Sequence, residues 1–247
     1  MAILEDDPEV DDLGGRMSLV EHLAELRRRL IISAIAVAVG AVIAFALYNW
    51  ILGLLIEPYR QATHNTKLQA LDPLEGFSAR LKIGTYCGLL IASPVVLWQF
   101  WRFITPGLHK REKRYAIPFV LTSILLFLMG AAVALITFEP ALNFLSGVGG
   151  SDLANQYTVS KYISFITLMI IAFGVSFEFP ILLVFLEIAG IVPSSKLRKW
   201  RRGAIVTIVA AAAVITPSQD PISLFAMAIP MYLFYEAAIL VGRWLKK

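Results

Sequence analysis

The chain has 247 residues, of which 58% are hydrophobic and 16% are charged, and its formal net charge is +4. Soluble domains carry about 25% charged residues, and several apolar runs here are long enough to cross a bilayer, so the composition excludes an ordinary soluble domain. The runs do not alternate in hydrophobicity as the strands of a membrane barrel do. The sequence therefore predicts an all-α integral membrane protein. Its one cysteine, Cys87, lies in an apolar run and cannot form an intrachain disulfide.

The first residues differ from the rest of the chain. Residues 1–16 contain six acidic residues and few apolar ones, which predicts a disordered acidic tail. Ser18 and Glu21 have the spacing of a capping box at the start of a helix. Leucines at helical spacing follow, so we expect residues 18–29 to form an amphipathic helix on the membrane surface. The first apolar run is too long for the core of a cleavable signal peptide and is interpreted as a retained helix.

Residues 17–247 are predicted to form a single domain of six transmembrane helices, because no long polar linker divides them. The predicted spans are 30–56, 77–103, 115–138, 162–190, 203–216 and 222–241. Pro58 is expected to end the first span, and Pro140 to follow the end of the third. Glu178 and Pro180 interrupt the fourth. The fifth covers only about 21 Å at helical rise, so we expect the membrane to thin there, or the fifth and sixth helices to lie partly behind others.

The positive charges indicate an orientation. With six spans, one side of the membrane receives every Lys and Arg except Arg60, Lys67, Arg80, Lys82 and Lys161. Cytoplasmic loops carry the excess of positive charge. Both termini are therefore predicted to be cytoplasmic, together with the loop after the second span and the loop after the fourth.

Enzyme signatures are absent from the sequence. It contains no HExxH, no GxSxG, no phosphate-binding glycine loop and no cluster of His and Cys at metal-ligand spacing. The three histidines, His22, His64 and His109, are scattered outside the spans. We therefore expect neither enzymatic activity nor a cofactor, a metal ion or a nucleic-acid partner.

Glu178 is the most unusual single residue, because a carboxylate within a span costs roughly 2.5–3.5 kcal/mol on insertion scales. Pro180 lacks an amide N–H, and so frees the carbonyl of Ser176, two residues before Glu178. One interpretation is a protonated glutamate hydrogen-bonded to a neighbouring helix. The other is a proton relay or a polar contact for a partner helix. The residues alone favour neither.

Glu25 and Glu112 form a second candidate site, since both are carboxylates among arginines on the predicted cytoplasmic side. Taken separately, each is explained by surface ion pairing, for example of Glu25 with Arg29 at i,i+4. Taken together, two carboxylates at the membrane surface are suited to receive guanidinium groups, whose fork geometry favours bidentate pairing. Composition alone does not decide between these interpretations.

Four segments resemble one family. They are His-Leu-Ala-Glu-Leu-Arg-Arg-Arg-Leu at 22–30, Ser-Pro-Val-Val-Leu-Trp-Gln-Phe-Trp-Arg-Phe-Ile-Thr-Pro-Gly-Leu at 93–108, Phe-Gly-Val-Ser-Phe-Glu-Phe-Pro at 173–180 and Ala-Ile-Pro-Met-Tyr at 228–232. Their sequence and order are similar to TatC, the multispanning receptor subunit of the twin-arginine protein translocase. The resemblance extends from about residue 18 to the end of the chain, and it implies the concave six-helix arrangement of that family.

The resemblance implies a function and a set of site residues. Members bind the twin-arginine signal peptide of a folded precursor in the bacterial inner membrane, associate into multimeric receptor complexes, and recruit single-span TatA and TatB subunits for export driven by the proton-motive force. Carried over by position, the residues implied to contact the signal peptide are Glu25, Arg27, Phe103 and Glu112. Glu178 matches a polar residue facing the concave hollow, Pro58 a position in the periplasmic cap, and Asp220 an acidic residue in the turn before the last helix. The position of a glutamine that contacts TatB in some members falls near Leu224, so this contact does not transfer directly.

A second class of function is a proton-coupled secondary transporter that uses Glu178. Such proteins usually show paired broken helices in two repeats. Only one charged break of this kind is clear in this sequence, which argues against a transporter.

Overall fold

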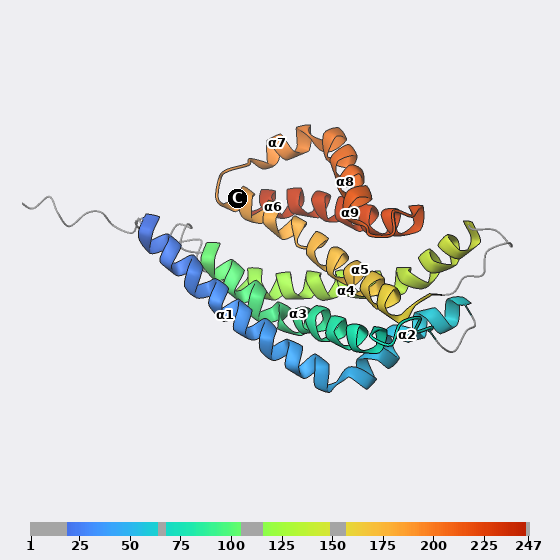
Figure 1. The fold of residues 1–247 in the computed structure, drawn as a ribbon. Helices are drawn as coiled ribbons and strands as arrows, with labels where there is room; N and C mark the ends of the chain where they lie inside the picture. Colours follow the sequence, from blue (N-terminus) through green and yellow to red (C-terminus); the bar gives the residue numbers. More distant parts are fainter. Residues whose placement is uncertain (1–18, 64–67, 105–115, 149–156, 246–247) are drawn as a thin grey trace, which may run out of the picture.

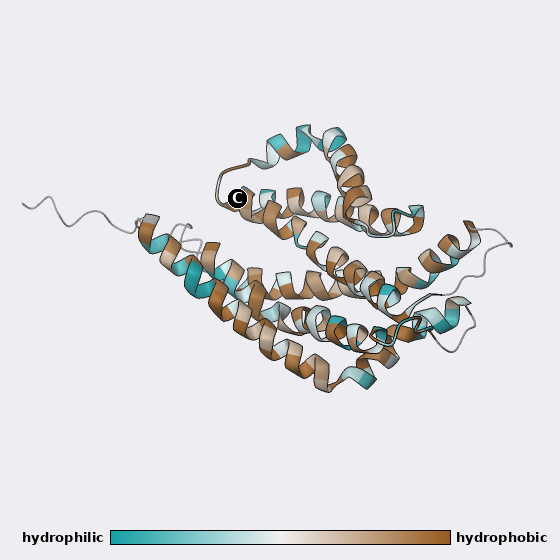
Figure 2. Cartoon of the chain, viewed as in Figure 1, coloured by the Kyte–Doolittle hydropathy of each residue, from teal (hydrophilic) through white to brown (hydrophobic). Residues whose placement is uncertain are grey.

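The computed structural model describes residues 19–63, 68–104, 116–148 and 157–245, and the regular elements of these ranges are helices (Figure 1). Their bounds are α1 Leu19–Ala46, α2 Tyr48–Thr63, α3 Glu75–Ile104, α4 Ala116–Val148, α5 Val159–Ser176, α6 Phe179–Ile188, α7 Ser194–Lys199, α8 Arg201–Ile215 and α9 Pro221–Leu245. Five stretches of the described chain are long and apolar enough to cross a membrane, counting α5 and α6 as one. The protein is therefore a multi-pass membrane protein. The hydropathy colours of Figure 2 show hydrophobic residues along most of these helices.

The first predicted span ends too late, at residue 56. The expected surface helix and the span form one continuous helix, α1, which ends at Ala46 rather than at residue 56. The chain turns at Leu47, and α2 then runs through Pro58 without a break. Tertiary contacts hold α2 through the proline: the Tyr162 hydroxyl donates to the Leu55 carbonyl at 2.6 Å, and Tyr59 is buried against the rings of Tyr157 and Tyr162.

The third predicted span, in contrast, ends too early, at residue 138. Pro140 lies inside α4, which continues to Val148. Phe138, Ala141 and Leu142 are almost completely buried on either side of the proline. Their packing compensates for the hydrogen bond that proline removes.

The predicted interruption of the fourth span is confirmed. Helix α5 ends at Ser176 and α6 begins at Phe179, with Glu178 between them. Pro180 occupies the first turn of α6, where a missing amide costs little. The predicted fifth span corresponds to α8, whose 15 residues are fewer than the other spans have.

Close helix contacts depend on glycine. A Cβ atom added to Gly88 of α3 would lie 2.5 Å from the Cα of Ala41 on α1, and one added to Gly130 of α4 would lie 2.6 Å from the Phe173 carbonyl oxygen on α5. Small residues of this kind let helices approach closely in a membrane, where dispersion rather than the hydrophobic effect drives packing.

The helix ends form two groups at opposite ends of the bundle. The start of α1, the end of α3 and the end of α9 lie at one end of the bundle, on the left in Figure 1, while α2 and the turn between α8 and α9 lie at the other. At that second end, Gln69 makes two backbone hydrogen bonds with the start of α5: its N–H donates to the Tyr157 carbonyl, and its carbonyl accepts from the Val159 N–H. The candidate residues near the start of α1 and the end of α3 therefore share one end of the molecule.

Candidate functional site

Glu25 is held in place by Arg29 one helical turn later on α1. The Arg29 Nε donates to Glu25 Oε1 at 3.0 Å, and its Nη1 donates to Gln99 Oε1 on α3 at 3.2 Å. Each of the two charged side chains is only 16% exposed. The expected i,i+4 ion pair is thus present, and it also fixes α1 against α3. The other Glu25 oxygen, Oε2, is buried and accepts no hydrogen bond within the described residues.

The ring of His22 lies against Phe103. The two ring centroids are 4.4 Å apart with planes 20° from parallel. This stack joins the first turns of α1 to the end of α3, about one helical turn from Glu25 on α1 and from Gln99 on α3. The sequence alone predicts no role for His22, because no local pattern marks a contact between residues so far apart in the chain.

Arg27 and Glu112 are the other two candidate residues predicted at this end, and the structure describes only Arg27. Arg27 is exposed on α1, and no carboxylate in the described ranges pairs with it. Glu112 lies outside the described residues, so the expected closeness of Glu25 and Glu112 stays a prediction. What the structure does bring together here is Glu25, Arg29, Gln99, His22 and Phe103.

Glu178 ends a chain of hydrogen bonds that joins three helices. The buried Trp101 Nε1 on α3 donates to the Ser123 hydroxyl oxygen on α4 at 2.9 Å, and that hydroxyl donates to Glu178 Oε2. A serine hydroxyl has one proton to donate and can also accept a hydrogen bond. Ser123 therefore accepts from Trp101 and donates its only proton to the Glu178 carboxylate. The sequence identifies Glu178 but not its partners, which are 77 and 55 positions away.

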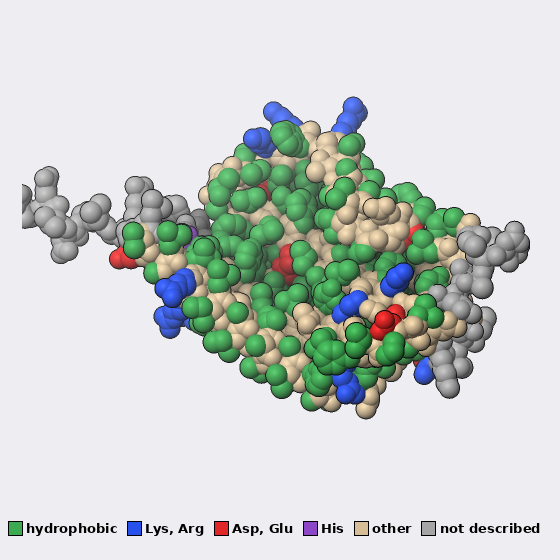
Figure 3. Space-filling model, viewed as in Figure 1, with side chains coloured by type: hydrophobic (Ala, Val, Ile, Leu, Met, Phe, Trp, Pro, Cys, Tyr) green, Lys and Arg blue, Asp and Glu red, His purple; other side chains and the backbone are tan. Residues whose placement is uncertain are grey.

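The second Glu178 oxygen faces a different environment. Oε1 accepts no hydrogen bond in the described part of the chain. Glu178 lines a largely apolar hollow of about 300 Å³ formed by α3, α4, α5 and α6; the other lining residues are Leu89, Ser93, Val96, Leu97, Phe100, Phe127, Ile171, Val175 and Leu182. Figure 3 shows an acidic side chain surrounded by hydrophobic ones on this side of the molecule. Such a group can accept a hydrogen bond from a donor on an apolar segment that enters the hollow.

Pro58 and Asp220 lie on separate elements at the other end. Pro58 is half-buried within α2. Asp220 is 2% exposed, and its Oδ1 accepts a hydrogen bond from the Ser223 amide at 2.8 Å. That bond satisfies a free amide at the start of α9, so Asp220 caps this helix. The preceding residue, Gln219, has a φ of 49°, a left-handed conformation that turns the chain sharply before the cap.

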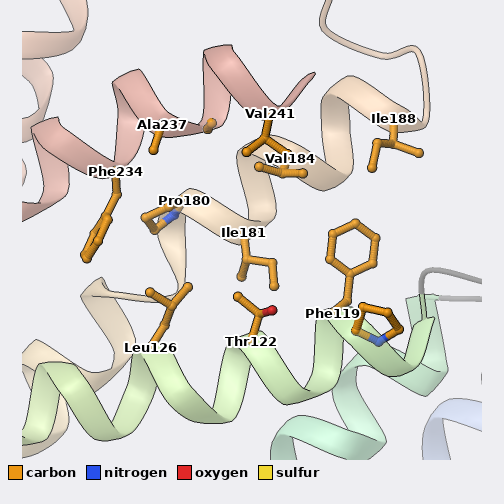
Figure 4. Close-up of a pocket in the computed structure, with 12 residues that line it drawn as sticks. Phe119, Thr122, Leu126, Pro180, Ile181, Val184, Ile188, Phe234, Ala237 and Val241 are labelled. Carbon is orange, nitrogen blue, oxygen red and sulfur yellow. The ribbon is translucent and has the colours of Figure 1, made fainter. Parts of the chain in front are cut away.

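A second hollow, of about 340 Å³, lies between α4, α6 and α9 (Figure 4). Phe119 and Leu126 approach it from α4, Ile181 and Val184 from α6, and Phe234 from α9. Thr122 supplies its one hydroxyl, and none of its lining residues is titratable. The lining therefore offers packing surface but no acid–base or ligand chemistry. Nor do three His, Cys, Asp or Glu side chains gather as a metal site anywhere in the described ranges.

Comparisons with known proteins identify what the chain is similar to. The family model of the Sec-independent protein translocase protein (TatC) matches residues 21–230. The TatC protein of Aquifex aeolicus is 44% identical over 92% of this chain and 95% of its own length. That of Frankia casuarinae is 40% identical over 94% of this chain, which spans 66% of the Frankia protein.

Solved structures give the same result. A crystal structure of a twin-arginine translocase receptor, TatC, superposes with a TM-score of 0.75 at 41% identity, covering 92% of this chain and all of that one. A second crystal structure of the receptor, in DDM, has a TM-score of 0.76 at 42% identity. At this level of identity the likeness extends beyond the general fold to the arrangement of the helices that carry the candidate residues.

Proposed function

Because the chain belongs to the TatC family of Sec-independent protein translocase proteins, we propose that it is the signal-peptide receptor of a twin-arginine translocase. Members of this family are components of a protein translocase and are not enzymes. The receptor binds the twin-arginine signal peptide of a folded precursor with Glu25, Arg27, Phe103 and Glu112. The observation that carries this proposal is the environment of Glu25, a mostly buried carboxylate with one oxygen unused by the described residues.

The chemistry of Glu25 suits an arginine ligand. Arg29 uses only Oε1, so Oε2 remains available to a second guanidinium. A charge-assisted bond made where solvent is largely excluded is stronger than the same bond on an open surface. Gln99 holds Arg29 from α3 and thereby fixes the direction in which the carboxylate points. A pair of carboxylates, Glu25 with Glu112, gives each arginine of the peptide its own acceptor.

The membrane arrangement belongs to the same proposal. The protein spans the bacterial inner membrane six times, with both termini in the cytoplasm and the short α8 as its fifth span. The concentration of Lys and Arg at the ends of α1, α3 and α9 and around α7 supports this orientation. The peptide site at the start of α1 then faces the cytoplasm, where precursors are made.

Glu178 is proposed to contact the single-span partners TatA and TatB. Its carboxylate stands at the break between α5 and α6 and lines an apolar hollow. A polar side chain on a partner helix can bond there at the depth of the membrane, where few other acceptors exist. Pro58 and Asp220 belong to the periplasmic cap and turn, and copies of the receptor associate into a multimeric complex that works with the proton-motive force.

The alternative of a proton-coupled transporter rests on Glu178 alone. Uptake of a solute together with protons by the purified protein in liposomes, lost on Glu178→Ala, would support it. The similarity to translocase receptors in both sequence and structure favours the receptor instead.

Crosslinking tests the receptor site. A signal peptide carrying a photoreactive group beside its arginine pair is expected to crosslink to the inserted wild-type protein, and Glu25→Ala combined with Glu112→Ala is expected to abolish the product. Glu57→Ala combined with Glu139→Ala is the matched control, because it removes two carboxylates from the other end of the bundle. Unchanged crosslinking in the first variant, at equal insertion, would contradict the site.

A further inference from the structure

The junction of α7 and α8 carries the largest group of positive charges that lie close together in sequence among the described residues. Lys196, Arg198, Lys199, Arg201 and Arg202 lie within seven positions, and Figure 3 shows Lys and Arg side chains projecting over these helices. Arg201 is paired with Glu236 of α9 at 2.5 Å. No carboxylate in the described ranges pairs with the other four. The surface therefore holds positive charge that lacks a partner in this part of the protein.

An apolar slot opens beside these charges. Its volume is about 290 Å³, and it lies between α6, α8 and α9 with α7 across one end. Leu183, Ala204 and Ile208 are among its lining residues, while Lys196 and Trp200 join the lining from the charged segment. Apart from Lys196, no lining residue carries a charge at neutral pH. The slot thus combines an apolar interior with a cation at one end.

Contacts between α7 and α9 hold the slot open. The Tyr235 hydroxyl donates to the Leu197 carbonyl at 2.6 Å, and both side chains are buried. Glu236, next in the chain, accepts from Arg201 and also from the Tyr232 hydroxyl at 3.0 Å. Because two adjacent residues of α9 bind the α7–α8 segment, the cations and the slot have a fixed relation to one another before any ligand arrives.

The arrangement of α7 suits a membrane–water boundary. Lys196 and Lys199 share one face of α7 by their i,i+3 spacing, and Trp200, which caps the end of the helix, lies near Lys196. The Trp200 side chain is 65% exposed, and the Lys196 Nζ lies 5.6 Å from the centre of its ring. Exposed tryptophan and lysine at the end of a span are typical of the level at which lipid headgroups lie.

We propose that this slot is a binding site for an anionic phospholipid. One acyl chain occupies the apolar slot, and the phosphate lies on Lys196 and Lys199. Charge complementarity favours this occupant. A zwitterionic lipid brings no net negative charge to the four cations that lack a carboxylate partner among the described residues. A soluble anion has no apolar part that could fill the slot. Basic pockets between transmembrane helices select anionic headgroups for the same reason. This inference does not rest on signal-peptide binding.

Native mass spectrometry of the delipidated full-length protein tests the headgroup half of the site. Titration with phosphatidylglycerol and with phosphatidylcholine of the same acyl chains is expected to show tighter binding of the first. Lys196→Gln combined with Lys199→Gln is expected to lower the affinity for phosphatidylglycerol by about tenfold or more, given the usual strength of lysine–lipid attraction. Arg60→Gln combined with Lys161→Gln removes the same charge from the opposite end and is expected to leave the affinity unchanged.

A second pair of variants tests the slot. Ala204→Phe fills the slot without changing charge and is expected to weaken phosphatidylglycerol binding, whereas Ala210→Phe, on the same helix but outside the slot lining, is not. Equal binding of the two lipids to the wild type would overturn the proposal. So would equal affinities of the Ala204→Phe and Ala210→Phe proteins, which would leave the slot to some other occupant, such as a partner helix. Folding of each variant is checked by its thermal transition in the same detergent.

Discussion

The Ser123 hydroxyl on α4 donates a hydrogen bond to the carboxylate of Glu178, at the break between α5 and α6. The same hydroxyl oxygen accepts from Trp101 on α3 at 2.9 Å. One small side chain thus joins three helices around a carboxylate that lies at a transmembrane depth. This arrangement explains how the fourth span is interrupted without leaving all of its polar groups unpaired.

Ser123→Ala is predicted to destabilise the protein by about 1–3 kcal/mol, because it removes the hydroxyl that accepts from the Trp101 N–H and that donates to the part-buried Glu178 carboxylate. Thermal unfolding in detergent, or unfolding under controlled denaturation in bicelles, measures the change. Thr122→Ala, at an exposed position one residue earlier, serves as the control and is expected to have little effect. Equal stability of the two variants would show that the hydrogen-bond chain contributes nothing.

Glu178→Gln is predicted to preserve more export than Glu178→Leu. Glutamine keeps an amide oxygen that can accept from Ser123 and a second polar atom toward the hollow, whereas leucine leaves the serine hydroxyl without an acceptor. Export of a twin-arginine precursor in cells, at matched receptor levels, distinguishes the two. Equal loss in both would mean that the negative charge itself is required.

Gly88→Ala is predicted to separate α1 from α3. The new methyl carbon would lie 2.5 Å from the Cα and amide nitrogen of Ala41, and backbone atoms cannot move aside as a flexible side chain can. Overpacking of this kind costs typically about 1–3 kcal/mol. Gly53→Ala is the matched control, since a Cβ atom there meets nothing within 4 Å. The thermal transitions of the two variants measure the difference, and a stable Gly88→Ala protein would contradict the close crossing.

Phe103→Ala is predicted to weaken signal-peptide binding by up to about tenfold, because the stack with His22 that fixes the start of α1 beside α3 is lost. Phe103→Tyr keeps the ring and is expected to retain most of the affinity. The control is Phe77→Ala, an exposed phenylalanine near the other end of the same helix. Titration of a fluorescent signal peptide gives the three dissociation constants. Loss of affinity in the tyrosine variant equal to that in the alanine variant would argue against a role for the ring itself.

Features that depend on neighbouring residues were predictable from the sequence. Glu178 and Pro180 predict the break in the fourth span, and the spacing of Glu25 and Arg29 predicts their ion pair. Pro58 and Pro140 predict helix ends that the structure does not have, because packing of distant side chains such as Tyr162 keeps both helices intact. The turn at Leu47 contains neither glycine nor proline, so no local signal marks it.

Contacts across the bundle were not predictable in this way. Ser123 lies within an apolar run that has no local sign of a polar contact. Its hydrogen bond to the Glu178 carboxylate depends on the packing of α4 against α6. His22 and Phe103 meet because α1 and α3 cross closely through Gly40 and Gly88, which places their ends together. Single-sequence patterns carry no information on which distant residue will occupy the facing helix.

The proposed function requires the protein to recognise paired arginines. The most direct test is equilibrium binding of a labelled twin-arginine signal peptide to the full-length protein alone in lipid nanodiscs. We predict saturable binding that is lost when the two arginines of the peptide are replaced by lysines, because lysine lacks the planar, forked set of N–H donors of a guanidinium. Equal affinity for the two peptides would contradict the proposal.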